Sequence, residues 1–344
     1  MQKNAWRHGL MLFASIGFWT SCSSNSSKEK TIPRPWMRSA SSGLMQKNFD
    51  AFGVRVIVRA TSQASLNSAV SEFGHLISIF DHLKSGSDIA RINDKAYEEP
   101  VTVSPETVNV LQTCQALYDF SDHKFDVSFV PYQSDDSNEF NAITDWDHKE
   151  KLSPGTLRLF GQQNVLLDPT TRQIRVYNKR TKLNLRGMIR GYAAEQALFI
   201  MQKNGATGGS ILTDNYVAAF GSELKNKNLF CIENPDHLGN CLYRIEPTDL
   251  SHTLFLAHSA SAERHGTMYD PKDTWTYRSG GITVAGQNGA WVQFAATVTT
   301  LMDDGQLDGF LKKSIHPKLA ASYFDSIQTR KLNGSLLPFA KISQ

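Results

Sequence analysis

The sequence predicts an α+β fold, a single domain of mixed, mostly antiparallel strands with packed helices. Strand-like segments come in runs, with helices interspersed but without the strict alternation of a doubly wound sheet. No linker-like change of composition follows Ala51. The chain of 344 residues, 40% hydrophobic and 20% charged, is long enough to bury a substantial core.

Four helices are predicted from apolar spacing and from start and stop signals. In residues 63–83, apolar side chains recur at helical spacing. Ser104, Pro105 and Glu106 give a capping hydroxyl, a first-turn proline and a first-turn acid for a helix to about residue 119. Residues 187–204 form the third helix and end before a glycine. The fourth contains Thr297 and ends at residues 303–305.

Short strands are predicted in the rest of the chain. Residues 164–168 and 173–177 flank a turn-forming Pro-Thr-Thr-Arg segment and indicate a hairpin. Residues 133–151 are polar and acid-rich and indicate a surface loop. The other predicted strands are residues 54–59, 210–213, 216–220, 229–233, 253–257 and 281–285.

The N-terminus has the pattern of a secretory signal. Lys3 and Arg7 precede a short apolar run that ends at Trp19, and small residues then lead to Cys22. We expect a signal peptide at 1–21, a lipidated Cys22 with a flexible tether at 22–50, and the folded domain at 51–344. An ordinary signal peptide with an unrelated cysteine is the alternative. A lipidated Cys22 would anchor the domain on the periplasmic side of a bacterial membrane.

The remaining cysteines allow two interpretations. Cys231 and Cys241 flank a turn-rich segment between two apolar runs, so a cross-hairpin disulfide and two independent thiols both fit. Cys114 lies in a helical pattern and is expected to pack in the core.

Several classes of function lack support. The net charge is +3, and the basic residues form no stripe with aromatics, so no nucleic-acid partner is expected. The sequence has no Cys/His set at zinc spacing, no P-loop, no dinucleotide fingerprint and no Gly-x-Ser-x-Gly nucleophile motif.

Six segments, taken in order, resemble the ApbE-type FAD:protein FMN transferase family. Each alone is a weak signal, but their common order is much more specific. They cover roughly residues 52–305 and are Phe80–Asn93, Lys124–Pro131, Asn184–Glu195, Ser259–Arg264, Thr267–Pro271 and the Gly289–Gly305 helix segment.

This resemblance implies a transfer of FMN from FAD to a Thr hydroxyl of a membrane redox protein, with AMP leaving and Mg²⁺ assisting. The catalytic residues stay unassigned. By position in the motifs, Phe52, Phe125, Asp126 and Glu195 would contact FAD. The metal ligands would be Gln293, Thr297 and the carbonyl of Leu198.

The sequence departs from the family pattern at chemically important positions. Gln293 replaces an Asp, and Mg²⁺ prefers anionic oxygens. Arg186 stands at a glycine position, Arg190 replaces a Lys and Thr267 replaces a His. His265 is an alternative for that His, and Asp214 or Asp270 could supply the missing carboxylate.

Three hypotheses follow. They are an active transferase, a catalytically silent flavin-binding lipoprotein on the same fold, and a periplasmic lipoprotein without a flavin.

Overall fold

The protein is described by a computed structural model. It divides into two units, Met1–Ile32 and Pro33–Gln344, and every described residue belongs to the second. The described residues are 37, 43–128, 158–226, 228–234, 237–247, 250–260, 281–313, 320–324, 329–330 and 340–343. The predicted signal peptide and Cys22 lie outside them.

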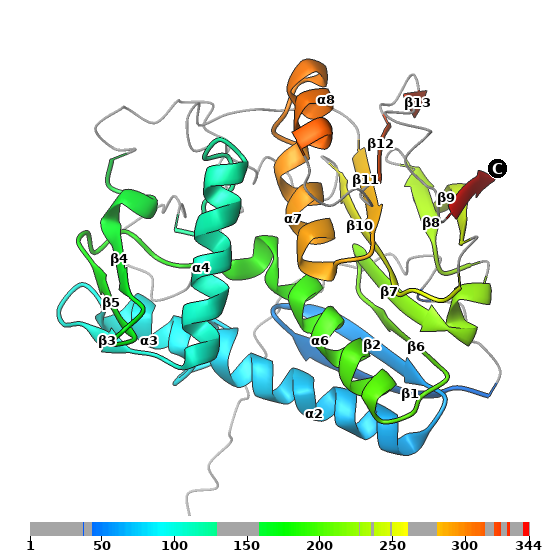
Figure 1. Ribbon diagram of the computed structural model, residues 1–344, viewed down its shortest axis with the longest axis horizontal. Coiled ribbons are helices and arrows are strands. Elements are labelled where there is room, and N and C mark those ends of the chain that lie inside the picture. The colour runs from blue at the N-terminus through cyan, green and yellow to red at the C-terminus, as the bar shows by residue number, and fades with distance from the viewer. Residues whose placement is uncertain are drawn as a thin grey trace, which may run out of the picture. The chain divides into compact units, whose positions relative to one another are not determined.

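The central element is a sheet, in which eight strands are described (Figure 1). Every pairing between its described strands is antiparallel, which confirms the α+β prediction. In spatial order the strands are β1 (Met45–Ala51), β2 (Val54–Ala60), β6 (Gly208–Leu212), β7 (Tyr216–Gly221), β10 (Leu254–Ala260), β11 (Gly281–Gly286), β12 (Ala320–Phe324) and β13 (Thr329–Arg330).

Both faces of this sheet are buried at its centre. In β7, Tyr216 and Ala218 belong to one hydrophobic core, whereas Val217 and Ala219 belong to a second core. Successive side chains of a strand point to opposite faces, so both faces must be apolar. This explains why these strands are continuous apolar runs in the sequence.

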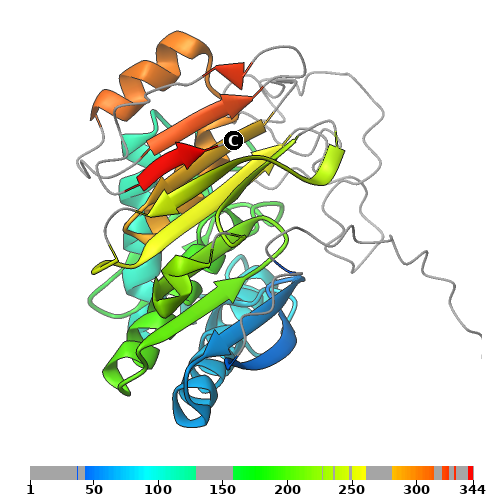
Figure 2. The same ribbon diagram turned by 90° about the vertical axis from the view of Figure 1, so that its right-hand side faces the viewer.

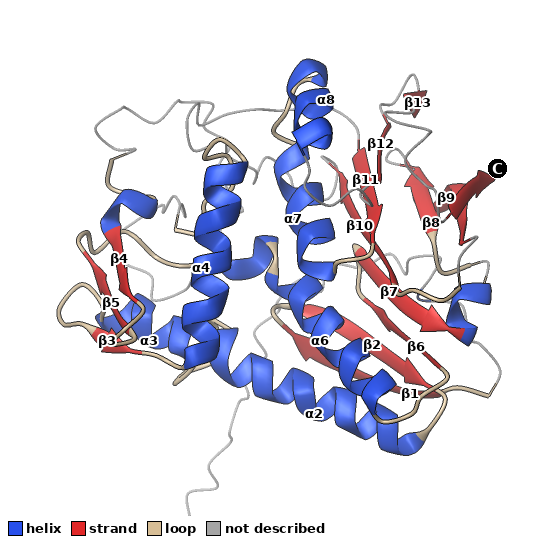
Figure 3. Ribbon diagram, viewed as in Figure 1, coloured by secondary structure: helices blue, strands red, loops and turns tan. Residues whose placement is uncertain are grey.

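Helices cover one face of the sheet (Figures 1 and 3). α2 (Gln63–Phe80) packs on β1 and β2, α6 (Ile189–Lys203) on β6 and β7, and α7 (Gly289–Thr299) on β10 and β11. α6 also contacts both α2 and α7, so it lies between them. The other described helices are α3 (Asp88–Lys95), α4 (Pro105–Phe120), α8 (Asp304–Lys313) and the 3₁₀ turns η1 (Gln162–Asn164), η2 (Leu185–Gly187) and η3 (Ser222–Lys225).

Two small sheets complete the described fold. The first contains β8 (Cys231–Asn234), β9 (His237–Pro247) and β14 (Ala340–Ser343), and Figure 2 shows the C-terminal strand beside β9. Cys231 and Cys241 form a disulfide between β8 and β9, with Cα atoms 5.6 Å apart. The second contains β3 (Val101–Thr102), β5 (Gln173–Val176) and β4 (Val165–Asp168).

The structure differs from the sequence interpretation in three places. β1 begins at Met45, within the stretch assigned to the tether. The sequence did not predict this strand, because its exposed polar residues give no alternating apolar pattern. α3 overlaps the Phe80–Asn93 segment and is not among the four predicted helices, because its eight residues are too few for a clear periodicity. α7 ends at Thr299, before the predicted stop at residues 303–305, and α8 begins at Asp304, inside that segment. No helix among the described residues is long and apolar enough to span a bilayer.

Candidate active site

The site is built where α6 crosses α7. Gly191 in the first turn of α6 and Gly289 at the start of α7 meet backbone to backbone. A Cβ added to Gly191 would overlap the carbonyl oxygen of Gly289, and a Cβ on Gly289 would lie 2.5 Å from the carbonyl oxygen of Gly191. Only glycine fits both positions, so the crossing brings the side chains of one helix to the backbone of the other.

Gln293 of α7 is fixed by backbone groups at both ends of its amide. Its Oε1 accepts a hydrogen bond of 2.5 Å from the Gly191 N–H, and its Nε2 donates one of 2.9 Å to the Arg186 carbonyl. The N–H can only donate and the carbonyl can only accept, so these partners determine the orientation of the amide. The side chain is buried, with 6% exposed.

Thr297 lies one turn further along α7, next to η2. Its hydroxyl lies 3.2 Å from the Gly187 carbonyl and 2.9 Å from the Gln293 carbonyl, both of which are acceptors. Gln293 and Thr297 therefore contact two successive carbonyls, those of Arg186 and Gly187. The side chains of Gln293 and Thr297 thus both meet the backbone of η2.

Leu198, the third predicted metal ligand, is not at this place. It lies seven residues beyond Gly191 in the middle of α6, roughly 10 Å along the helix axis. Its side chain is buried in the hydrophobic core.

The donors at this crossing do not suit Mg²⁺. The metal prefers anionic oxygens in octahedral geometry, but Gln293 turns an N–H₂ group toward the Arg186 carbonyl and uses its oxygen on an N–H. Among the described residues, no group of three or more His, Cys, Asp or Glu side chains is placed to hold a metal ion. The Gln293 amide supplies the donor that this carbonyl needs, so the described site does not require a cation.

Glu195 connects the two helices through hydrogen bonds. Its Oε2 accepts from the backbone N–H groups of Gly289, at 2.9 Å, and Ala290, at 3.3 Å, and its Oε1 accepts from Asn288 Nδ2 at 3.0 Å. A carboxylate is favourable at these unsatisfied N–H groups at a helix start. Burial raises the pKa of Glu195, and the two backbone hydrogen bonds oppose that shift. The residue predicted to contact FAD thus holds the start of α7.

Phe125 and Asp126 lie on the η2 side of the crossing. The Phe125 ring packs edge-on against Phe294, with centroids 5.0 Å apart, and lies against Gly187 so closely that a Cβ there would be 2.7 Å from the ring. The Asp126 carboxylate accepts from Ser128 N and Oγ at 2.8 and 2.6 Å, and from Gln162 N at 3.0 Å. In this arrangement Asp126 fixes the loop that positions Phe125.

Phe52 and Gly53 form the two-residue turn between β1 and β2, which pairs Ala51 with Val54. Both turn residues have positive φ, 51° for Phe52 and 75° for Gly53. This matches a type I′ turn, where a bulky residue such as Phe is strained. Strain of this kind is concentrated at functional sites.

Arg190 of α6 reaches the same turn. Its Nη2 lies 3.4 Å from the Phe52 carbonyl oxygen, and its Nη1 lies 3.4 Å from Asn215 Oδ1 and 3.9 Å from Asp214 Oδ1. Asp214 and Asn215 are in the β6–β7 turn, so one guanidinium joins two turns at one end of the sheet. Asp214 lies beside Arg190 and not at Gln293.

Arg186 lies over Gly53. A Cβ added to Gly53 would be 2.7 Å from Arg186 Nη2. Burial lowers the pKa of Arg186, and the charge of Asp81 opposes that shift. Beside it, burial lowers the pKa of His82 to about 4, helped by the charge of Arg186 and opposed by Asp81. His82 is therefore neutral at physiological pH, although sequence reasoning did not single it out.

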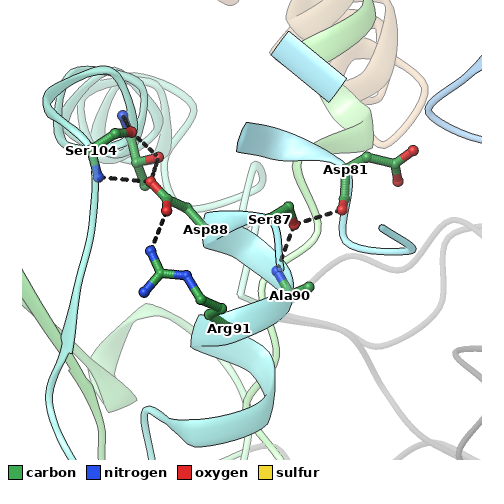
Figure 4. Close-up of polar contacts among 7 residues, drawn as sticks. Asp81, Ser87, Asp88, Ala90, Arg91 and Ser104 are labelled. Atoms are coloured by element: carbon green, nitrogen blue, oxygen red, sulfur yellow. Dashed lines mark hydrogen bonds and ion pairs between the residues drawn. The ribbon is translucent and has the colours of Figure 1, made fainter. Parts of the chain in front are cut away.

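The loop that carries Asp81 and His82 is held by a separate polar network, shown in Figure 4. Ser87 Oγ donates to the Asp81 carbonyl at 2.7 Å and accepts from Ala90 N at 3.0 Å, which caps α3. Asp88 Oδ2 accepts from Ser104 N at 2.7 Å, and Asp88 also pairs with Arg91. Burial acts to raise the pKa of Asp88, but these hydrogen bonds outweigh it and the pKa is lowered. The network joins α2, α3 and α4.

A second polar group missed by sequence reasoning lies at the end of β10. His258 Nδ1 and Thr283 Oγ1 are 2.9 Å apart. The backbone N–H of His258 donates to the Asn215 carbonyl at 2.8 Å. Ser259 Oγ is buried with no hydrogen-bond partner among the described residues. These residues lead into 261–280, which contains Thr267, His265 and Asp270 and lies outside the described part of the chain.

The fold is that of known flavin transferases. ApbE from Vibrio cholerae superposes with a TM-score of 0.64 at 12% identity, covering 87% of this chain and 96% of that structure. The ApbE protein of Thermotoga maritima gives 0.63 at 18% identity, covering 81% and 94%. Likeness at such identities establishes the fold alone.

The sequence then gives the family. The ApbE family profile matches residues 52–322, most of the chain, so this protein belongs to the ApbE family. A relative from Chlamydia muridarum, named FAD:protein FMN transferase, is 26% identical over 159 residues. That alignment covers 44% of this chain and 45% of the relative, so this chain spans less than half the length of the relative.

Proposed function

We propose that this protein binds FAD at the α6–α7 crossing and transfers FMN to a Thr hydroxyl of an acceptor membrane redox protein. The observation that carries this proposal is the family match over residues 52–322, which includes every element that builds the site. A partial relative named FAD:protein FMN transferase adds support.

The reaction joins the acceptor oxygen to the phosphorus of the FMN half of FAD. The bond between this phosphorus and the oxygen of AMP breaks, and AMP leaves with the electron pair. The hydroxyl proton passes to AMP or to solvent. Positioning and positive charge contribute most to this type of transfer, because charge develops on the phosphoryl oxygens.

The described residues supply both contributions. The strained Phe52–Gly53 turn has the guanidinium groups of Arg186 and Arg190 at its two residues. The Phe125 ring packs on Gly187 of η2. Because the described donors do not suit Mg²⁺, no step is assigned to a metal here.

We also propose that Cys22 is lipidated and anchors the domain on the periplasmic side of a bacterial membrane. The support is the sequence pattern of residues 1–22. An anchor of this kind would place the site next to membrane redox proteins that carry the target Thr.

The test is incubation of the full chain with FAD and a membrane redox protein that carries a candidate acceptor Thr. Covalent flavin is detected as in-gel fluorescence and AMP by chromatography. We expect both products, and an acceptor with that Thr replaced by Val should yield neither. Absence of labelled acceptor and of AMP, with FAD bound, would contradict the transferase proposal.

The closed hydrogen bonding of Gln293 favours a second candidate, a catalytically silent flavin-binding protein. Its amide and the Thr297 hydroxyl are both used on backbone groups of this chain. The same incubation distinguishes the candidates, because a silent binder retains FAD without forming AMP.

A further inference from the structure

Arg186 has unused hydrogen-bonding capacity. Its Nε is buried and has no hydrogen-bond partner among the described residues. Among the described residues no carboxylate forms an ion pair with its guanidinium within 4 Å, and the charge of Asp81 acts on it from a longer distance. A partly buried guanidinium without an ion pair is costly, and an anionic ligand would remove that cost.

The backbone of Arg186 is fixed at the centre of the site. Its carbonyl accepts from Gln293 Nε2, and its N–H donates to Asn184 Oδ1 at 3.0 Å. The side chain extends from this fixed point to Gly53. Main chain and side chain together connect the α6–α7 crossing with the β1–β2 turn.

Arg190 brings a second guanidinium to the same turn. Arg186 lies at Gly53 and Arg190 at the Phe52 carbonyl, so the two positive groups lie at successive residues. The contacts of Arg190 with Phe52, Asn215 and Asp214, between 3.4 and 3.9 Å, are long for charge-assisted hydrogen bonds. An oxyanion at this turn would give the buried Nε of Arg186 a hydrogen-bond partner and would lie close to both positive charges.

Arginine is suited to this role. Its planar group binds two phosphate oxygens at once and stays charged even when burial lowers its pKa. The Gln293 amide meanwhile provides the donor at the Arg186 carbonyl. In this chain, positive charge is therefore supplied next to the crossing by side chains.

We propose that Arg186, together with Arg190, binds the diphosphate of the substrate and supplies the positive charge without a metal ion. This rests on the proposed function, since FAD is the diphosphate ester that the reaction requires. The site deepens that function by assigning the charge to two named residues.

The experiment measures binding of FAD, riboflavin and inorganic pyrophosphate to the full chain in EDTA, by flavin fluorescence and by competition. Wild type should bind FAD equally well in EDTA and in Mg²⁺, and pyrophosphate should displace it. Arg186→Ala should weaken FAD binding about 10- to 100-fold, the usual effect of losing a charged hydrogen-bond pair. Riboflavin, which lacks phosphate, should bind both proteins alike.

Two further variants keep the result interpretable. Arg55→Ala removes a positive charge near the same turn from a side chain that is 67% exposed, and should leave FAD binding unchanged. Arg186→Lys retains the charge but not the planar group, and should recover only part of the affinity. Thermal unfolding of each variant checks its fold, and Arg186→Lys serves if the alanine variant does not fold.

The failures are distinguishable. Unchanged or tighter FAD binding by a folded Arg186 variant, or loss of wild-type FAD binding in EDTA, would overturn the arginine site and leave the proposed function standing. If wild type bound neither FAD nor riboflavin, both the arginine site and the proposed function would be overturned.

Discussion

Replacing Gln293 by Glu tests the hydrogen bonding at the helix crossing. The change keeps the length of the side chain and its acceptor for the Gly191 N–H. In wild type, Gln293 Nε2 donates to the Arg186 carbonyl at 2.9 Å, and the change replaces this donor by a carboxylate oxygen. A buried acceptor left without its donor costs about 1–3 kcal/mol, which at roughly 2–4 °C per kcal/mol lowers Tm by several degrees.

The loss should depend on pH in a defined direction. Burial and the facing carbonyl raise the pKa of the new Glu above its ordinary value of about 4.3. Below about pH 4.3 the carboxyl is protonated and donates to the Arg186 carbonyl, so the stability of the variant approaches that of wild type. Its stability then falls as pH rises through the raised pKa.

Thermal unfolding followed by circular dichroism at pH 4 and pH 8 measures this difference. In Gln293→Glu a carboxylate oxygen faces the Arg186 carbonyl oxygen, and Mg²⁺ binds oxygen ligands of this kind. Excess Mg²⁺ should therefore restore part of the Tm of the variant and leave the Tm of wild type unchanged. Gln63→Glu, an exposed change at the start of α2, should shift stability by less than about 0.5 kcal/mol. Equal Tm values for Gln293→Glu and wild type at both pH values would refute this reasoning.

The remaining predictions concern packing, the disulfide and a buried histidine. Gly191→Ala should lower the free energy of unfolding by about 1–3 kcal/mol or more in urea, because its Cβ overlaps Gly289, whereas Gly74→Ala in α2, with open space around it, should be neutral or stabilising. Reduction of the Cys231–Cys241 bond, which closes a short loop, should cost about 2–4 kcal/mol, and an unchanged Tm in dithiothreitol would contradict this. Because the pKa of His82 is about 4 in the folded chain, wild type should lose stability as pH falls from about 6.5 to 4; His82→Gln should lose less, and parallel pH curves would contradict this.

The sequence was sufficient where a local pattern decides the structure. Ser104 and Pro105 predicted the start of α4, and it begins at Pro105 with Ser104 as its cap. The apolar runs predicted most central strands, because both faces of the sheet are buried.

The arrangement of the site could not be predicted in the same way. The residue type at 293 is visible in the sequence, but its two backbone partners lie 102 and 107 residues away along the chain. Glu195 was expected at FAD, whereas its carboxylate meets the start of α7 through a contact across the helix crossing. The convergence of Arg186 and Arg190 on one turn likewise depends on how α6 packs against the sheet.

The most direct test of the account is FMN transfer by wild type and Arg186→Ala, with FAD and an acceptor protein, in EDTA. We expect covalent flavin on the acceptor and stoichiometric AMP for wild type without a metal, and strongly reduced transfer for the folded variant. Transfer that requires Mg²⁺ in wild type, or that proceeds equally in Arg186→Ala, would contradict it.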